Sequence, residues 1–299
     1  MPKILTFTAN LLAETTYHYG DWKPAATQRA PRETFQVGGK GINVSKMLTR
    51  LGSYNEAICF PGGHYGPRCL DWIENKNIRT RAYTDDCETR SGTVVSSERI
   101  AETTFLGLNS QVSEIAIQQC VAELQTETNH HLFAICGSIQ NWDSPQWNPL
   151  RDYLATRRVE CHLVVDTYGP SLKWFLQQKP EVIKINRQEL ESLFPKDKQH
   201  APTQSLLQEI SSQTFKTTWI VTDGGNSIWI KEKKTLPYEI TPPKTVCVSA
   251  TGCGDVFFAT FLDAVYNRKN GSIRDAATLA ADYASRNASK PEIAEFSLE

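Results

Sequence analysis

A carboxylate stands directly after a glycine-rich turn near the end of the sequence. Gly252, Cys253 and Gly254 precede Asp255, and a long apolar segment follows. If that segment is a helix, its first N–H groups and its dipole attract an anion, and glycines let a phosphate approach the backbone. A carboxylate beside an anion needs a chemical task, such as accepting the proton of a hydroxyl nucleophile. An ordinary helix N-cap is the structural alternative.

A second glycine-rich stretch, residues 37–44, leads into another segment with a helical pattern. Its spacing is not that of a dinucleotide-binding fingerprint, because Val44 takes the place of the last glycine. It is not a Walker A loop either, because no Ser or Thr follows Lys40. Taken alone, the stretch predicts a plain connection from a strand to a helix.

Two more polar stretches follow apolar runs of strand length. Asn186 and Glu189 are three residues apart, so they share one face of a helix that begins where a strand ends. Ligands bind at that end of open α/β sheets, and this pair could organise hydrated Mg²⁺, although a capping box would explain it as well. The stretch 222–226 predicts a hairpin turn, which could also lie against a nucleotide.

The composition is that of a folded globular protein. With 40% hydrophobic and 22% charged residues, the 299-residue chain is neither disordered nor membrane-like. A net charge of −1 argues against non-specific binding to nucleic acid, which needs a basic surface. The eight cysteines contain no C-x-x-C pair, which favours reduced thiols over a disulfide framework or a zinc site.

The first residues resemble a signal peptide faintly, because Lys3 precedes an apolar run. Asn10 and three threonines interrupt that run, so a first buried strand is the better interpretation. No apolar run approaches the ~20 residues that a membrane helix needs. We therefore expect a cytoplasmic protein without a membrane partner.

The elements that must position these residues alternate along the chain. Short apolar runs predict buried strands at residues 4–8, 131–136, 161–166, 181–186 and 219–222. Helical patterns occupy residues 41–51, 67–74, 113–125, 145–156, 170–178, 187–194, 202–211, 255–268 and 273–285. This alternation predicts an α/β fold with a mostly parallel sheet.

One region departs from this alternation. Residues 32–37 and 90–99 alternate polar and apolar side chains, as strands do when one face of their sheet meets water. They predict a small accessory sheet that is inserted into the α/β fold. No repeat, low-complexity tract or linker marks a second independent domain.

The order and spacing of the four polar stretches resemble the PfkB (ribokinase-like) carbohydrate kinase family over nearly the whole chain. Within the family, Lys40 in the stretch of residues 37–44 resembles the sugar-phosphate branch, which includes 1-phosphofructokinase and tagatose-6-phosphate kinase. The resemblance implies one ribokinase-like domain over residues 1–299, with a three-layer α/β/α core. It also implies a β-sheet lid whose strands come from about residues 9–37 and 88–108.

The resemblance assigns roles to individual residues. Asp255 would be the catalytic base, and the amides of Gly252, Cys253 and Gly254 would form an anion hole for the transferred phosphoryl group. Asn186 and Glu189 would support Mg²⁺, in part through water. Lys184, Asn186, Thr222 and Gly224 would bind ATP; Glu14, Gly38, Gly39 and Asn43 would face the sugar; Lys40, Arg90 and Ser138 would contact the phosphate of the substrate.

The function implied is ATP- and Mg²⁺-dependent phosphoryl transfer to a hydroxyl of a ketohexose phosphate. Glu14 departs from the family, which has Asp there, and Cys253 stands where alanine is usual. Two alternatives stay open: a kinase for an unphosphorylated sugar, sugar acid or nucleoside, and a catalytically silent binding protein on the same fold. The exposed edges of the lid sheet would allow a homodimer.

Overall fold

The structure is a computed structural model of the chain. It describes residues 3–84, 86–97, 102–127, 131–156, 161–212, 214, 216–269 and 271–298. Residues 98 and 99, the end of the predicted strand segment 90–99, lie outside the described residues.

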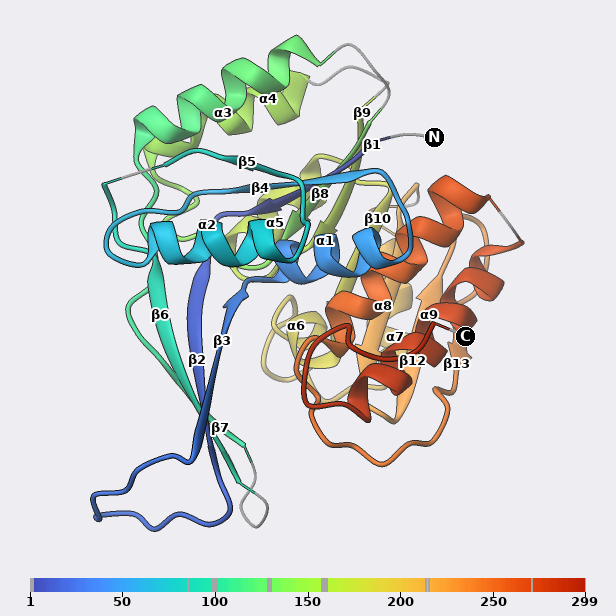
Figure 1. Ribbon diagram of the computed structural model, residues 1–299. Coiled ribbons are helices and arrows are strands. Elements are labelled where there is room, and N and C mark those ends of the chain that lie inside the picture. The colour runs from blue at the N-terminus through green and yellow to red at the C-terminus, as the bar shows by residue number, and fades with distance from the viewer. Residues whose placement is uncertain are drawn as a thin grey trace.

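The main sheet has nine strands in the order β13-β12-β11-β10-β9-β8-β1-β4-β5 (Figure 1). All neighbours from β11 to β5 pair in parallel, and β12 and β13 pair antiparallel. The strands are β1 Lys3–Thr8, β4 Asn55–Cys59, β5 Thr80–Ala82, β8 His131–Cys136, β9 Cys161–Asp166, β10 Val182–Asn186, β11 Thr218–Asp223, β12 Ser227–Lys231 and β13 Tyr238–Ile240. The five predicted core strands are confirmed, and the turn after β11 is the predicted hairpin.

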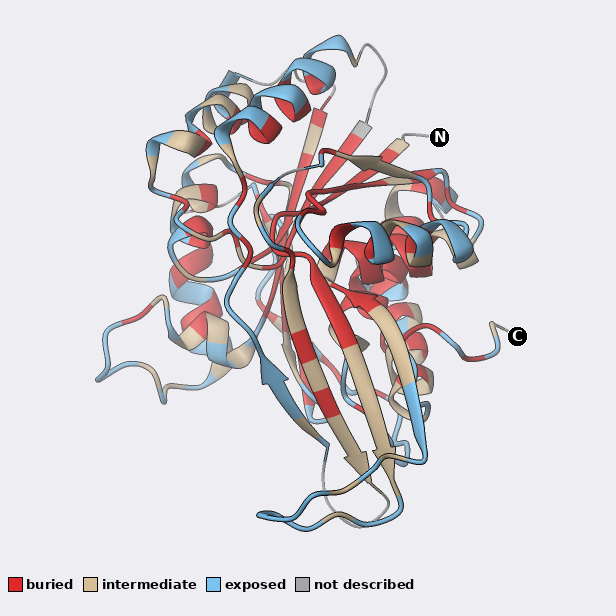
Figure 2. Cartoon of the chain, turned by 60° about the vertical axis from the view of Figure 1, so that its left-hand side comes forward, coloured by how far each residue is buried: buried red, intermediate tan, exposed pale blue. Residues whose placement is uncertain are grey.

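Helices cover both faces of this sheet and form the three layers that the family resemblance implied (Figure 1). On one face, α3 Glu114–Thr126, α4 Asn148–Thr156, α5 Pro170–Gln177, α6 Arg187–Glu191 and α7 Thr203–Ser211 enclose the largest apolar cluster. On the other face lie α1 Lys40–Arg50, α8 Cys253–Leu262 and α9 Ile273–Ala288, beside α2 Gly66–Asn75. Figure 2 shows buried residues concentrated in the central strands and on the helix sides that face them.

The last part of the predicted helix 255–268 differs from the prediction. The chain leaves α-helical geometry after Leu262 and forms a π-helical turn over Asp263–Arg268. In that turn the Asn267 amide donates to Ser53 Oγ at 2.9 Å, and Arg268 Nε pairs with Asp263 at 2.6 Å. The long-range contact to Ser53 leaves no mark on the apolar periodicity of the segment.

A second sheet of four strands, called the small sheet below, projects from the main body (Figure 1). Its strands are β2 Leu12–Tyr19, β3 Arg32–Gly38, β6 Arg90–Ser97 and β7 Thr103–Leu106, in the order β3-β2-β6-β7. The chain enters it from β1 and leaves it from β3 into α1, so the small sheet is inserted into the α/β core, as predicted.

Candidate active site

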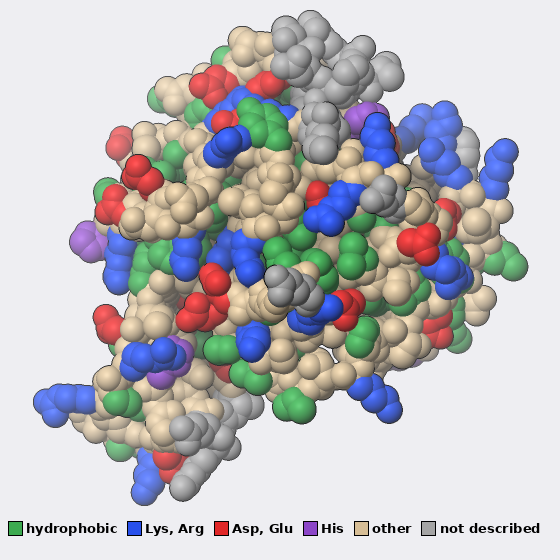
Figure 3. All heavy atoms as spheres, turned by 45° about the vertical axis from the view of Figure 1, so that its right-hand side comes forward, with side chains coloured by type: hydrophobic (Ala, Val, Ile, Leu, Met, Phe, Trp, Pro, Cys, Tyr) green, Lys and Arg blue, Asp and Glu red, His purple; other side chains and the backbone are tan. Residues whose placement is uncertain are grey.

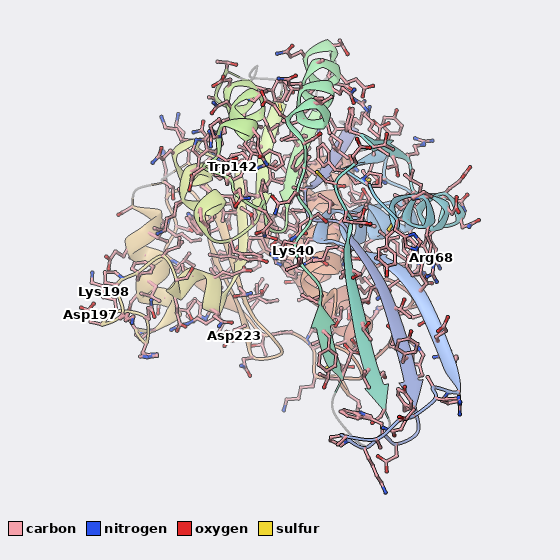
Figure 4. All side chains as sticks on the ribbon, turned by 90° about the vertical axis from the view of Figure 1, so that its left-hand side faces the viewer. Lys40, Arg68, Trp142, Asp197, Lys198 and Asp223 are labelled. Atoms are coloured by element: carbon pink, nitrogen blue, oxygen red, sulfur yellow. The ribbon has the colours of Figure 1, made fainter. Side chains whose placement is uncertain are left out.

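Five neighbouring parallel strands bring polar residues to one edge of the main sheet. These strands end at Thr8 in β1, Cys136 in β8, Asp166 in β9, Asn186 in β10 and Asp223 in β11, which Thr222 precedes. The first turns of α1 and α8 reach this edge as well. In Figure 4, Lys40 at the start of α1 lies near the middle of the molecule, where the small sheet meets the main body.

Asp255 is buried in the first turn of α8, with 6% of its surface exposed. The side chain of Asn43, on the neighbouring α1, donates a hydrogen bond to Asp255 Oδ2 at 2.7 Å. Burial and the nearby Asp166 carboxylate raise the pKa of Asp255 to about 6, against the opposing influence of Lys40, Lys184 and Asn43. A carboxylate with this pKa is ionised at neutral pH and still basic enough to accept a proton.

The start of α8 combines free amides with a positive charge. Cys253 N–H donates to the carbonyl of Ala250 at 3.3 Å, while the amides of Gly252 and Gly254 have no backbone acceptor among the described residues. Lys184 Nζ lies only 2.7 Å from the position that a Cβ on Gly254 would take. The site can therefore stabilise an anion through two amides and an ammonium group, rather than through three consecutive amides.

A buried ion-pair network connects the strand ends. Asp166 is fully buried and pairs with Lys40 Nζ at 2.6 Å and with Lys184 Nζ at 2.8 Å. Burial raises the pKa of Asp166, but the two ammonium groups outweigh burial and hold it below its ordinary value. Sequence reasoning missed Asp166 as a site residue, although its place at the end of a buried parallel strand was a usable signal.

The Asn186–Glu189 pair forms the capping box that was the structural alternative. Asn186 Oδ1 accepts from Glu189 N–H, and Glu189 Oε2 accepts from Asn186 N–H, both at 2.8 Å. The other carboxylate oxygen, Glu189 Oε1, lies 3.6 Å from Lys40 Nζ. The cap thus fixes a carboxylate whose second oxygen faces the ion-pair network.

Thr222 and Gly224 lie beside this pair. Thr222 is in register with Asn186 on the adjacent strand, and its hydroxyl donates to the carbonyl of Ile185 at 3.5 Å. Gly224 has a positive φ of 54° in the hairpin turn between β11 and β12. These residues form a continuous polar edge with Lys184 and Asn186.

A small recess of about 80 Å³ lies next to Lys40, and its volume suits a phosphate-sized group. It is lined by Thr8, Asn10, Gly39, Lys40, Arg90, Cys136, Gly137, Ser138 and Tyr168. Two buried polar atoms there, Arg90 Nε and Thr8 Oγ1, have no hydrogen-bond partner among the described residues. Asn10 donates to Ser138 Oγ at 3.0 Å, which fixes that hydroxyl. The recess offers two cations and unpaired donors, so it fits an anion.

Glu14 does not line this recess. It faces a separate cavity of about 310 Å³ between the small sheet and the C-terminal segment that contains Ile293. Gly38 packs against Leu12, and Gly39 lines the recess. The structure therefore brings Gly39, Lys40, Arg90 and Ser138 together and places Glu14 in a neighbouring cavity, although the charges of Glu14 and Arg90 influence each other.

The fold and this edge define a class of protein: a three-layer α/β protein with a helix-end anion site beside a buried carboxylate. The chain belongs to the pfkB family of carbohydrate kinases, whose family model matches residues 9–298. It is therefore a carbohydrate kinase, and ATP is the phosphoryl donor that membership in this family implies.

Two curated relatives cover most of the chain. One is the 1-phosphofructokinase of Borreliella burgdorferi, 26% identical over 98% of this chain and 94% of that protein. The other is the D-tagatose-1-phosphate kinase of Bacillus licheniformis, 26% identical over 87% of this chain and 84% of that protein. Both are named as kinases of sugar phosphates, the branch of the family that the stretch around Lys40 resembles.

Solved structures share the fold. Phosphofructokinase-2 of Escherichia coli, solved with fructose-6-phosphate, superposes with a TM-score of 0.83 at 20% identity, covering 96% of this chain and 94% of that one. Ribokinase of Thermotoga maritima superposes with a TM-score of 0.74 at 14% identity, covering 98% and 95%. Within the described residues, no helix is long and apolar enough to span a membrane.

Proposed function

We propose that this protein transfers the γ-phosphoryl group of ATP to a hydroxyl of a sugar phosphate, and that the sugar is a ketohexose. The recess beside Lys40 carries this proposal, because its buried Arg90 Nε has no hydrogen-bond partner among the residues that the structure describes and its volume suits a phosphate. The relatives named for fructose and tagatose phosphates support the same class of substrate. The phosphate of the substrate would lie in the recess. The sugar would extend toward Asp255, beside the cavity that Glu14 and Thr251 line.

The geometry supports a simple mechanism. The Asp255 carboxylate takes the proton of the acceptor hydroxyl as that oxygen bonds to the γ-phosphorus, and the bond to the ADP oxygen breaks. Asn43 orients the carboxylate through its 2.7 Å hydrogen bond. The amides of Gly252 and Gly254 and the Lys184 ammonium group would stabilise the charge of the phosphoryl group; the lack of backbone acceptors for these amides among the described residues and the closeness of Lys184 to Gly254 support this role.

Mg²⁺ fits this edge as a hydrated ion. Among the described residues, no three His, Cys, Asp or Glu side chains lie close enough together to hold a metal. Mg²⁺ commonly keeps several waters and binds one or two carboxylates plus substrate phosphates. Glu189, held by its cap with one oxygen toward the network, would contact such an ion through water, beside Asn186. The ion would neutralise charge on the phosphates of ATP.

The small sheet would act as a lid over the sugar and as a dimer interface. Phe105 and Leu106 in its edge strand β7 and Leu108, two residues beyond that strand, are exposed, with 57%, 55% and 93% of their surface accessible. Unpaired strand edges with apolar side chains favour association with a second copy. A tetrameric form is known for phosphofructokinase-2 of Escherichia coli. We also assign the protein to the cytoplasm, since its eight cysteines are all free thiols.

The decisive experiment measures ADP formation from ATP and Mg²⁺ across a panel of sugars and sugar phosphates, for the wild type and Asp255→Asn. We expect turnover on a ketohexose phosphate and a loss of about 10²–10⁴ in the variant, with ATP binding retained. Asp275→Asn is the matched control, because Asp275 lies in the first turn of α9 and only caps that helix. Turnover restricted to unphosphorylated acceptors would refute the sugar-phosphate assignment, and an active Asp255→Asn would refute the base.

A further inference from the structure

Glu14 is a buried carboxylate in an unfavourable setting. It lies on β2 with 7% of its surface exposed. Burial raises the pKa of Glu14, and the nearby Glu102 carboxylate adds to this, whereas a hydrogen bond from Gln36 and the charge of Arg90 lower it. A buried carboxylate is stable only where hydrogen bonds satisfy it, so the donor that satisfies Glu14 is of interest.

That donor is Gln36 on the neighbouring strand. Glu14 and Gln36 are directly opposite each other in the β2–β3 register, and Gln36 Nε2 donates to Glu14 Oε1. Both side chains line the cavity of about 310 Å³ beneath the small sheet. Among the described residues, Gln36 is the only hydrogen-bond donor to Glu14, which leaves Oε2 without a donor.

We propose that Gln36 is a positioning residue, which holds the Glu14 carboxylate so that its second oxygen accepts a hydroxyl of the sugar. This inference rests on the proposed function. A glutamate has one more rotatable bond than an aspartate, and its side chain loses more conformational freedom when a ligand fixes it. A cross-strand hydrogen bond fixes the side chain before the ligand arrives, which lowers the cost of binding. Gln36 would thus offset the greater freedom of the longer side chain, so that Glu14 on β2 can bind the sugar.

The first test measures the affinity for fructose 1-phosphate and fructose 6-phosphate by calorimetry, without turnover. We expect Gln36→Leu to weaken binding of the preferred ligand about 5- to 20-fold with ATP affinity unchanged. Its melting temperature should fall modestly, because the buried Glu14 carboxylate loses its donor. Thr15→Val is the matched control, because Thr15 is the next residue of β2 and does not line the cavity. Unchanged sugar-phosphate affinity in Gln36→Leu, or no binding of either ligand by the wild type, would overturn the inference.

A second test asks whether Gln36 acts through Glu14. In a Glu14→Gln background, the further change Gln36→Leu should weaken binding less than about twofold, because the interaction is already lost. If the loss of affinity in the double variant equals the product of the losses in the two single variants, Gln36 acts independently of Glu14, and the inference is overturned. Loss of turnover in Asp255→Asn belongs to the proposed function and leaves this comparison of affinities unaffected.

The pH dependence of binding gives a third readout. Without Gln36 the pKa of Glu14 should rise further. As the pH is lowered, Glu14 should therefore become protonated, and lose its affinity for the sugar, at a higher pH in Gln36→Leu than in the wild type. Thr15→Val should keep the wild-type profile, and an unshifted profile in Gln36→Leu would contradict the positioning role. The other charged or titratable groups around the cavity, present in all variants, are His18, Arg32, Lys46, Lys76, Arg90, Glu102 and Glu292.

Discussion

At the scale of residues, ionisable side chains form a network at the carboxyl edge of the main sheet. Asp166 holds both Lys40 and Lys184, and these two cations in turn oppose the effect of burial on Asp255. Burial lowers the pKa of Lys40, but the carboxylates of Asp166 and Glu189 outweigh it, so this lysine stays charged. The network therefore keeps positive charge beside the carboxylate that we propose as the base.

This network predicts the pH dependence of turnover. Because the pKa of Asp255 is raised to about 6, the rate should fall about tenfold per pH unit below pH 6 and level off above it. In Lys40→Met this acidic fall in rate should begin at a higher pH, since Lys40 lowers the pKa of Asp255. Steady-state kcat measured between about pH 5 and 8 checks both statements. A rate that does not change with pH, or a fall in rate that begins at a lower pH in Lys40→Met, would contradict them.

At the scale of elements, the C-terminal segment supports the turn before α8. Asn287 in α9 donates to the carbonyl of Thr251 at 3.2 Å, and its side-chain oxygen accepts from Ala294 N–H at 2.7 Å. Ile293 packs directly behind Gly252, which has a positive φ of 74°. A side chain at position 252 would meet both a strained backbone and Ile293.

Gly252→Ala should therefore disturb both stability and catalysis. A Cβ at this position would lie 2.6 Å from Ile293, so the turn and its amides must shift. We expect a loss of roughly 2–4 kcal/mol in unfolding free energy and a drop of more than tenfold in turnover. Denaturant unfolding and steady-state kinetics measure these effects. Gly20→Ala is the control, because Gly20 has open space around it; equal behaviour of the two variants would disprove the argument.

At the scale of the whole molecule, the main body and the small sheet differ in how far they are buried. The main sheet is buried between helices, whereas the small sheet is largely half-buried (Figure 2). Charged side chains of both signs are interspersed on the face in Figure 3, with no extended patch of one sign. This distribution agrees with the net charge of −1 and with a small polar substrate.

The proposed dimer leads to a prediction at this scale. Replacing both Phe105 and Leu108 by Lys should convert the dimer to a monomer, because it places charges where apolar side chains would meet. Light scattering coupled to size exclusion measures the mass directly. Leu236→Lys is the control, since Leu236 is equally apolar and 71% exposed but lies far along the chain from the small sheet. A wild type that elutes as a monomer would refute the dimer.

The sequence by itself determined the core elements and the family. Strands buried on both faces leave apolar runs, so β1, β8, β9, β10 and β11 were predictable. Glycines and polar residues at strand-to-helix turns form local patterns that can be recognised in the sequence, which is why Asp255, Asn186 and the stretch around Lys40 were found. The strands β5, β7 and β13 have only three or four residues, too few for a clear pattern, and were missed. So was β4, in which the polar Asn55 and Glu56 interrupt the apolar run.

Only the tertiary structure decided which side chains meet. Lys40, Arg90 and Ser138 line one recess because strands β1 and β8 are neighbours and β6 pairs with β2. Strand order and register arise from packing between distant segments, and a local pattern does not encode them. For the same reason the sequence identified neither Asp166 as the partner of two lysines nor Gln36 as the residue opposite Glu14.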